Sequence, residues 1–538
     1  MNRRLVSLFA LTVLLASALS TLLRAQKIEA SGTIYIRADG SIDPTTAPIT
    51  SIGNVTYTFT DDIYSGADGI VIERDNIILD GAKYTLQGIG GGNGIDLSNR
   101  HNVTIADMGI RQFGTGLLDA FSYGNVLLRN NISANSYMGI RVHWSSDNVL
   151  RNNTVHNNKY NVGIYGDYYS HFRNDVDSSN LVDGKPVYYW IGKADISVPL
   201  DAGYVALYNC QRIDVQNLNL CNNGQGILLY NTEDSTILGN NIASNVNGIQ
   251  LYFSWNNIVS ENNVTDSEGD SGVNLYESSF NNVSRNHIIN NGNGIIVRSS
   301  SENNSIYENS IALNDWTGIS VQYDSVYNAI SKNNITENEY GMILNGNSNQ
   351  VFENYVSLNN DYGVELSSAS GNVLRKNSIT DNKRGFKVFG VSLSDFVNDI
   401  DTSNTVNGKP IYYWVSRQDA IVPIDAGFLA LINCTGITIQ NLNMSNNWQG
   451  VFLGYTNTSR IIGSSLADNN VGIELRFSFA NIITEDEFRN NTDCGISLYQ
   501  SAANRIEYNV IANNYVGVDP LESSNNIFAH NQFLSNNL

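Results

Sequence analysis

The peptides GILLY at residues 226–230, GIQLY at 248–252 and GVNLY at 272–276 repeat one pattern, in which a glycine precedes apolar residues at alternating positions. Further copies begin with Gly69, Gly94, Gly139, Gly318, Gly363, Gly472 and Gly495. Two further short apolar runs follow each peptide. The regular, short step from one such glycine to the next predicts one small structural unit per repeat.

The spacing of the apolar residues excludes a helical repeat, because no segment has apolar residues 3.6 positions apart. Three short strands fit in each unit. We therefore expect each unit to close one coil, whose strands pair in parallel with the next coil about 4.8 Å away. Ile227 and Leu229 should face the core and Leu228 should point outward. The predicted fold class is all-β, a right-handed parallel β-helix of the pectin-lyase type, with about 19 coils and three short strands per coil.

Asparagine is abundant between these runs. It tolerates the left-handed turn conformation and bonds to the backbone, so it suits the turns. Stacked from coil to coil, the amides should also bond to one another along the solenoid.

The peptide GKPVYYW at 184–190 returns as GKPIYYW at 408–414, and the matching sequence continues well beyond it. This indicates a duplicated block of about nine coils. Because the glycine-to-glycine step is longer here, we expect each copy to carry a projecting loop insertion. The predicted segments are a cap at 26–66, copy 1 at 67–290 with its insertion at about 167–200, and copy 2 at 291–538 with its insertion at about 390–424. The last residues predict an uncapped C-terminal end.

The N-terminus is typical of export. Arg3 and Arg4 precede an apolar stretch, so residues 1–25 are expected to be a signal peptide or an N-terminal anchor. We expect no other transmembrane span. With a net charge of −20 and only 15 % charged residues, the chain is a poor candidate for nucleic-acid binding.

The stretch IERDNIILDG at 72–81, the glycine-led coils and the GKP-Tyr-Tyr-Trp peptide together resemble a known group of archaeal exported proteins. These are parallel β-helix proteins with the NosD-like domain, which is named for a periplasmic copper-binding protein. The resemblance covers nearly all of the chain after residue 25. It implies a fold shared with carbohydrate-binding and sugar-hydrolysing β-helices, and it leaves the function open.

Copper is implied only by the name of that family. Copper sites need clustered His, Cys or Met. The six histidines lie on different coils without a paired motif, so we predict no metal site and no cofactor, although calcium is possible. The histidines are His101, His143, His156, His171, His287 and His530.

Aromatic residues are the candidates for ligand contact. Tyr230, Tyr252 and Tyr276 occupy the same place on three successive coils and should stack with rings about 4.8 Å apart, close to Phe253 and Trp255. Such a ladder can offer flat faces to sugar rings or can simply seal the turn between two sheets. The same alternatives apply to the aromatic residues of the repeated peptide, where we favour packing on the flank of a coil. These are Tyr189, Trp190, Tyr413 and Trp414.

Carboxylates give only weak catalytic candidates. A retaining glycosidase needs two carboxyl groups about 5 to 5.5 Å apart, which means neighbouring coils in one column. Glu474 and Asp519 share an outward column but lie two coils apart, about 9.6 Å. In the same column Glu365 is followed by Lys387, which predicts a surface ion pair.

Together these patterns favour an exported, monomeric β-helix module that binds a polysaccharide or surface glycan, or that serves as a structural or interaction protein of the cell surface. The first alternative is a polysaccharide-degrading enzyme, either a glycoside hydrolase or a lyase. The second is a copper-binding accessory protein. Whether the protein is an enzyme stays open, with binding favoured over catalysis.

Overall fold

The computed structural model describes residues 32–538. They form two compact units, residues 32–184 (unit 1) and residues 185–538 (unit 2), and each is described separately. The signal or anchor segment expected at 1–25 lies outside the described residues, as does the start of the expected cap at 26–66.

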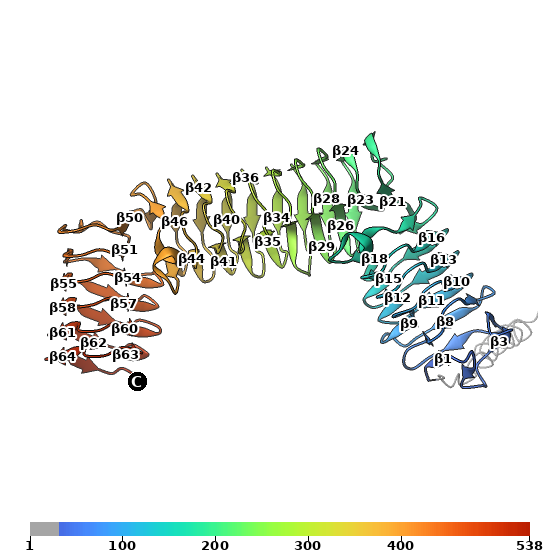
Figure 1. The fold of residues 1–538 in the computed structure, drawn as a ribbon, viewed down its shortest axis with the longest axis horizontal. Coiled ribbons are helices and arrows are strands. Elements are labelled where there is room, and N and C mark those ends of the chain that lie inside the picture. Colours follow the sequence, from blue (N-terminus) through green and yellow to red (C-terminus); the bar gives the residue numbers. More distant parts are fainter. Residues whose placement is uncertain (1–31) are drawn as a thin grey trace, which may run out of the picture. The chain divides into compact units, whose positions relative to one another are not determined.

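Each coil contains one longer strand and two short ones. In one coil of unit 2 these are β26 (Gln225–Tyr230), β27 (Thr236–Leu238) and β28 (Asn241–Ala243). β26 pairs in parallel with the equivalent strand of the next coil, with Ile227 opposite Ile249. This pairing repeats through residues 32–538, which form an all-β solenoid of about 22 turns with 2 % helix (Figure 1). The predicted fold class is confirmed, although the number of turns is higher than expected.

The longer strands of unit 1 belong to one sheet, and those of unit 2 belong to two sheets, ten strands to one and six to the other. In unit 1 they are β1 (Ile34–Ile36), β6 (Ile70–Ile72), β9 (Asn93–Asp96), β12 (Thr115–Ala120), β15 (Met138–His143) and β18 (Tyr160–Tyr165). In unit 2 the first ten are β21 (Lys185–Ile191), β23 (Tyr204–Tyr208), β26, β29 (Asn247–Tyr252), β32 (Ser271–Tyr276), β35 (Asn293–Arg298), β38 (Thr317–Val321), β41 (Tyr340–Leu344), β44 (Tyr362–Ser367) and β47 (Arg384–Phe389). They are followed by β50 (Lys409–Val415), β51 (Phe428–Ile432), β54 (Gln449–Gly454), β57 (Val471–Arg476), β60 (Cys494–Tyr499) and β63 (Val516–Leu521).

The first coil begins inside the expected cap. β1 pairs in parallel with β6, and β4 (Thr56–Phe59) pairs in parallel with the next coil while forming an antiparallel hairpin with β3 (Ile49–Ile52). Over its described part, the stretch at 26–66 is therefore a coil of the solenoid with a hairpin added to its edge.

The core consists of the inward residues of successive strands. Ile227 and Leu229 have no exposed surface, as predicted. Leu228 points to the outer face but is only 1 % exposed. The outer face of this sheet is thus largely buried too, and an outward position is not in itself a surface position.

Asparagine side chains form buried ladders that run from coil to coil. Asn286 Nδ2 donates to Asn309 Oδ1 at 3.0 Å, and Asn309 Nδ2 donates to Asn333 Oδ1 at 3.0 Å. The same oxygen of Asn309 also accepts the backbone N–H of Asn286 at 2.9 Å. Each rung thereby satisfies backbone groups at the turn that the strands leave without partners. The expected bonding between stacked amides is confirmed.

The repeated aromatic peptide is a strand of a coil, and this corrects the expected projecting insertions at about 167–200 and 390–424. β50 pairs in parallel with β51, the next strand along the chain, with Ile411 opposite Phe428. β21 pairs with β23 in a similar way, with Val187 opposite Tyr204. Each long glycine-to-glycine step therefore holds two coils, one of them unusually short, which accounts for part of the higher number of turns.

β50 is aromatic because it is buried on both faces. Ile411 and Tyr413 belong to one core, together with Phe386 and Phe396. Trp414 belongs to the next core, with Leu429 and Leu431. The short coil thus contributes large side chains to both cores of unit 2.

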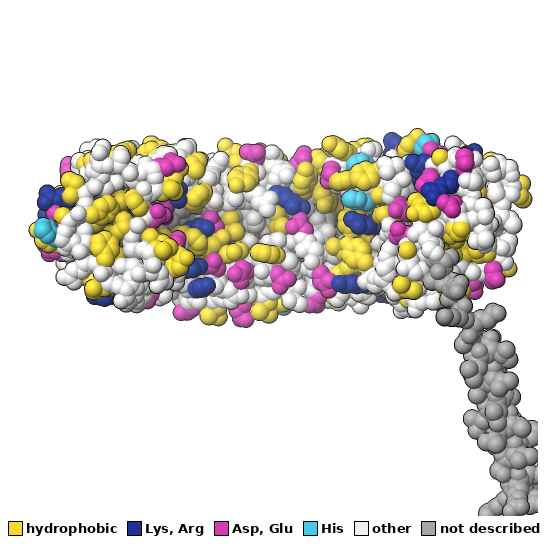
Figure 2. All heavy atoms as spheres, turned by 90° about the horizontal axis from the view of Figure 1, so that it is seen from below, with side chains coloured by type: hydrophobic (Ala, Val, Ile, Leu, Met, Phe, Trp, Pro, Cys, Tyr) yellow, Lys and Arg dark blue, Asp and Glu magenta, His cyan; other side chains and the backbone are white. Residues whose placement is uncertain are grey.

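Among residues 32–538, the structure contains no helix long and apolar enough to cross a membrane. The two helices in this range are single turns of 3-10 helix, η1 (Tyr169–Phe172) and η2 (Leu393–Phe396). On the face shown in Figure 2, acidic and basic side chains are interspersed among neutral polar ones, with small apolar groups between them.

Candidate functional site

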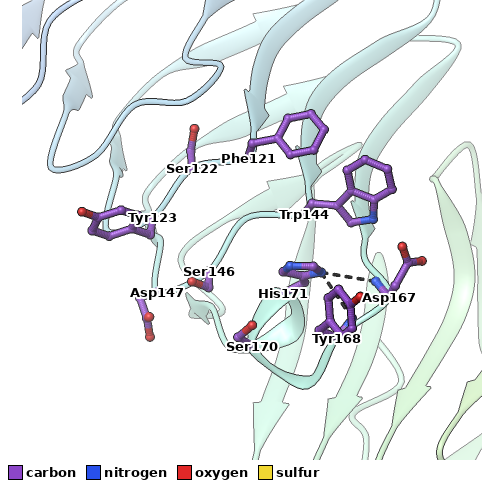
Figure 3. A pocket seen from close by; sticks show the side chains of 10 residues that line it. All are labelled: Phe121, Ser122, Tyr123, Trp144, Ser146, Asp147, Asp167, Tyr168, Ser170 and His171. Carbon is purple, nitrogen blue, oxygen red and sulfur yellow. Dashed lines mark hydrogen bonds between the residues drawn. The ribbon is translucent and has the colours of Figure 1, made fainter.

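A cavity of about 530 Å³ opens on the surface of unit 1. The turns that follow β12 and β15 form one side of it, and the segment 167–171, which contains the start of η1, forms the other (Figure 3). Its lining residues are Phe121, Ser122, Tyr123, Trp144, Ser146, Asp147, Asp167, Tyr168, Ser170 and His171.

The cavity wall is rich in aromatic rings. Phe121 meets Trp144 edge-on, with ring centroids 4.8 Å apart, and Trp144 stacks on His143 at 4.4 Å. Tyr168 meets the ring of His171 at 5.4 Å. Phe121 is 53 % exposed and Tyr168 is 71 % exposed, so these rings present open faces. Exposed aromatic faces of this kind suit the apolar faces of a ligand.

Two of these aromatic residues occupy a turn position that carries Asn in several other coils. Phe121 and Trp144 have φ of 54° and 53°, in the left-handed region. The equivalent residues Asn99 and Asn231 have φ of 61° and 47°. A bulky residue is disfavoured there, whereas Asn tolerates it. Phe253, Tyr455 and Phe477 show that rings at this position also occur outside the cavity, so the strained position alone does not mark the site.

Carboxylates and hydroxyls complete the lining. Asp147 is held by Arg173, whose Nε and Nη2 donate to its two oxygens at 2.7 Å each. This bidentate contact lowers the pKa of the Asp147 carboxyl. Asp167 lies on the opposite side, near Tyr168 (Figure 3). Ser146 and Ser170 add hydroxyl groups. The cavity can thus offer flat apolar faces and hydrogen-bond acceptors to one ligand.

The second copy lacks this lining. The alignment that places Gly184 on Gly408 in the repeated peptide also assigns a copy 2 residue to each cavity position. In it, Trp144 becomes Ser368, and Tyr168 becomes Ser392. The charged residues Asp147, Asp167 and Arg173 become Gly371, Val391 and Val397. The fold therefore does not require the aromatic and charged residues of the cavity.

The aromatic ladder expected from the sequence lies elsewhere, in unit 2. Tyr230 and Tyr252 stack with centroids 6.4 Å apart, and Tyr252 and Tyr276 are 5.5 Å apart. Both separations exceed the expected spacing of about 4.8 Å. Phe253 packs on Tyr230 at 5.2 Å. Tyr230 is only 2 % exposed, so this part of the ladder seals the turn.

Trp255 is the more accessible member of this group. It is 37 % exposed and, with Phe280, which is 60 % exposed, lines a second cavity of about 450 Å³. Its indole Nε1 donates to Glu233. The indole is held in place while part of its surface remains open.

The aromatic residues of the repeated peptide are mostly buried. Tyr189, Tyr413 and Trp414 are 5 %, 6 % and 7 % exposed, and Trp190 is partly buried against the core. The Tyr413 hydroxyl donates to the Phe396 carbonyl at 2.6 Å. These rings are thus part of a coil and its core, not of a loop packed on the flank of a coil as expected from the sequence.

The two weak catalytic candidates do not form a pair. Glu474 lies opposite Ser497, which lies opposite Asp519, so the two carboxylates are separated by one coil. Glu474 is engaged by Arg476 and accepts from Gln449 Nε2 at 2.8 Å. Asp519 is exposed. Their separation by one coil is the one expected from the sequence.

Sequence reasoning missed the cavity of unit 1 because it searched for what the two copies share. The signal lay in their differences. Aromatic residues follow two successive strands at 121 and 144, where Asn or Ser stands in several other coils, and the stretch DYYSH at 167–171 has no aromatic counterpart at 391–395.

The fold and its repeats define a right-handed parallel β-helix protein. A model of the right-handed beta helix region matches residues 41–198. The model of the family described as periplasmic copper-binding protein (NosD) matches residues 200–315, 310–414 and 397–538. The chain belongs to the NosD family. A search of curated proteins gave no significant match.

Solved structures with a similar fold are distant. The periplasmic alginate epimerase AlgG has 13 % identity over 68 % of this chain and 84 % of its own, with a TM-score of 0.31. DFA-IIIase from Arthrobacter chlorophenolicus A6 has 12 % identity over 71 % and 83 %, with a TM-score of 0.26. The catalytic domain of a GH87 alpha-1,3-glucanase has 13 % identity over 64 % and 61 %, with a TM-score of 0.24. We draw no functional argument from them.

The residues present do not fit the copper centre that the family description implies. Within residues 32–538, no group of three or more His, Cys, Asp or Glu side chains could hold a metal ion. His101 pairs with Asp75 and stacks on Tyr123, and His530 stacks on Tyr508. His143 and His156 share one coil, contrary to the expectation that all six histidines lie on different coils, but they end different strands of it, β15 and β17 (Thr154–His156).

Proposed function

We propose that the protein is an exported β-helix protein that binds neutral polysaccharide in the cavity of unit 1. The observation that supports this proposal is the aromatic lining, which copy 2 lacks. Aromatic rings that the fold does not need, with open faces around one cavity, are best explained by a ligand.

The charges of the cavity favour a neutral glycan over a polyuronide. Asp147 and Asp167 both line it, and the guanidinium of Arg173 is already occupied by Asp147. A uronate carboxylate would approach Asp167 without a free cation in the lining. The net charge of −20 adds a general repulsion of polyanions.

Trp255 is a second candidate contact for the same type of ligand. Its partly open indole and the neighbouring Phe280 border a cavity with Asn256, Glu277 and Ser279, which combines an apolar face with hydrogen-bonding groups. A long polysaccharide can use contacts on several coils, and contacts linked in this way reinforce one another.

Affinity electrophoresis and calorimetry with soluble mannan, dextran and β-glucan, and with alginate and polygalacturonate, test the proposal. We expect binding to a neutral polysaccharide, and a loss of about tenfold or more in Trp144→Ser and Tyr168→Ser, which corresponds to removing one stacking contact. These variants carry the residues of copy 2. Trp316→Ser is the matched control, since Trp316 is 60 % exposed and lies outside the cavity.

Equal affinity in wild type and Trp144→Ser, or binding of polyuronides alone, would overturn the proposal. Release of reducing ends from the bound polysaccharide would instead place the protein among the polysaccharide-degrading enzymes.

A further inference from the structure

We propose that His171 is a positioning residue that holds the cavity wall at 167–171 in place only while its Nδ1 is unprotonated, so that glycan binding weakens in acid. The part of this inference that concerns glycans rests on the proposed function, whereas the holding of the wall does not.

The geometry fixes the role of the ring. Nδ1 of His171 accepts the backbone N–H groups of Asp167 and Tyr168, each at 3.3 Å (Figure 3). A nitrogen that accepts hydrogen bonds cannot carry a proton. Protonation of His171 therefore turns both contacts into clashes between donors, at the residues that carry the Tyr168 ring and the Asp167 carboxylate.

The ring fits against a glycine. A Cβ atom at Gly166 would overlap Cβ of His171, so residue 166 must be glycine for the side chain to turn back over its own segment. The imidazole consequently sits inside the turn it stabilises. It is not a surface group that approaches from outside.

Copy 2 closes the equivalent turn with a carboxylate. Oδ2 of Asp395 accepts the backbone N–H groups of Val391 and Ser392, each at 2.9 Å. Gly390 again makes room, with a hypothetical Cβ 2.6 Å from Cβ of Asp395. A carboxylate stays an acceptor well into the acid range, because its ordinary pKa is about 4. The two copies thus close this turn in the same way, with one side chain accepting two backbone N–H groups, an arrangement that we call the latch. The imidazole and the carboxylate lose the ability to accept these bonds at different pH.

The surroundings of His171 decide whether the pKa of its imidazole is raised or lowered. Burial lowers the pKa of the His171 imidazole, and the carboxylate of Asp167 partly opposes this by raising it. His143, from β15, is the other titratable ring at this wall, and burial lowers its pKa too. Asp147 is neutralised locally by Arg173.

Because the imidazole pKa in the closed wall lies below its ordinary value of 6.5, the closed wall binds fewer protons than the open one. The latch is therefore complete above that ordinary value and is lost as the pH falls through the lowered pKa.

Amide hydrogen exchange on the full chain at several pH values, corrected for the intrinsic exchange rate, tests the latch without any ligand. We expect the N–H groups of Asp167 and Tyr168 to be protected near neutral pH and to lose protection once the pH has fallen through the lowered pKa of the imidazole. Val391 and Ser392 are the internal control and should stay protected. Equal protection of Asp167 and Tyr168 over this whole pH range would overturn the proposal.

His171→Asp, which places the carboxylate of Asp395 in copy 1, and His171→Asn should both keep the wall closed in acid. Two variants are used so that the test still works if one of them folds poorly. With the neutral polysaccharide that wild type binds best, we expect wild-type affinity to fall over the same pH range in which the latch is lost, in line with the smaller competent fraction. Both variants should bind alike throughout this pH range. A variant with the pH profile of wild type would contradict a role for His171. If no polysaccharide binds at any pH, the proposed function fails, while the exchange experiment still decides the latch.

Discussion

Trp144 and Ser368 occupy equivalent positions in the two copies and adopt the same left-handed backbone conformation, with φ of 53° and 50°. The turn is therefore built equally well with an indole and with a hydroxymethyl group. The indole adds nothing that the turn needs. Its contacts with Phe121 and His143 shape the wall of a cavity instead.

Phe121→Asn should leave the protein as stable as before or make it more stable. Phe121 is 53 % exposed and has φ of 54°, and relieving this conformation is worth about 1 kcal/mol. Urea unfolding followed by circular dichroism measures the change. A loss above about 2 kcal/mol would show that the ring packs as a core residue does.

Asn309→Ala should destabilise unit 2 strongly. The substitution removes the acceptor for the backbone N–H and the Nδ2 of Asn286, and the donor to the Val283 carbonyl. Each buried polar group left without a partner costs about 1 to 3 kcal/mol, so we expect a loss of about 3 kcal/mol or more in urea unfolding.

Asn241→Ala is the control for the ladder. Asn241 bonds to Asn219 at 3.0 Å in an exposed row of asparagines, where water can replace the lost contact. We expect a cost below about 1 kcal/mol. Equal costs for Asn241→Ala and Asn309→Ala would mean that burial of the ladder is unimportant.

Asp486→Asn should stabilise the protein above neutral pH. Asp486 stands in a ladder position where Asn is usual, and its Oδ1 accepts the backbone N–H of Ser464 at 2.6 Å. Its Oδ2 is buried without a hydrogen-bond partner. Burial raises the pKa of the Asp486 carboxyl from 3.8 to about 7.

The pKa of the Asp486 carboxyl is higher in the folded protein than in the unfolded chain. Below the pKa of the unfolded chain, the carboxyl is neutral in both states and does not oppose folding. Once the pH has risen through the pKa of the folded protein, the buried charge destabilises the folded state fully. Asp486→Asn should therefore change little near pH 4 and add a few kcal/mol above pH 7, at about 1.4 kcal/mol per pKa unit. Urea unfolding over this pH range measures it. Asp468→Asn, at an exposed carboxylate, should leave the pH profile unchanged.

Lys387→Met should destabilise unit 2 by about 3 kcal/mol, because it leaves the Glu365 carboxylate buried without its counter-charge. The two side chains meet at 3.0 Å with only 15 % and 8 % of their surfaces exposed, so the pair expected at the surface is largely buried. Lys387 Nζ also lies 4.1 Å from the ring centroid of Trp448. Thermal unfolding measures the loss.

The double variant Glu365→Leu with Lys387→Met should recover most of that stability, since two apolar groups replace the pair. If the double variant is as unstable as Lys387→Met alone, the cost lies in lost packing on Trp448 rather than in the unpaired charge.

The fold could be predicted because every coil repeats the same local rule. The alternation at Ile227 and Leu229 fixes which face is buried, and the regular step between the leading glycines fixes the length of the coil. The short coil at β50 could not be predicted in this way, because its strand carries large apolar residues on both faces and lacks the glycine-led pattern of the other coils. Only the position of a second core on its far side explains Trp414.

The site could be predicted only in kind. Aromatic residues were the right class, but Tyr230 and Trp414 are buried while Phe121 and Tyr168 are open. Which aromatic ring is covered depends on the turns of the neighbouring coils and on the segment at 167–171. The sequence pattern within one strand does not specify the positions of these neighbours. The latch at His171 depends on a side chain turning back over Gly166, which the sequence spacing alone does not specify.

In the buried asparagine rows, Asn309 meets its neighbours at 286 and 333 through the same two groups. A coil inserted into the stack would thus find complementary partners above and below, with no need for new surfaces. Whole turns can in this way be gained, lost or copied in evolution, and a newly copied block is free to acquire a binding pocket while its twin preserves the scaffold.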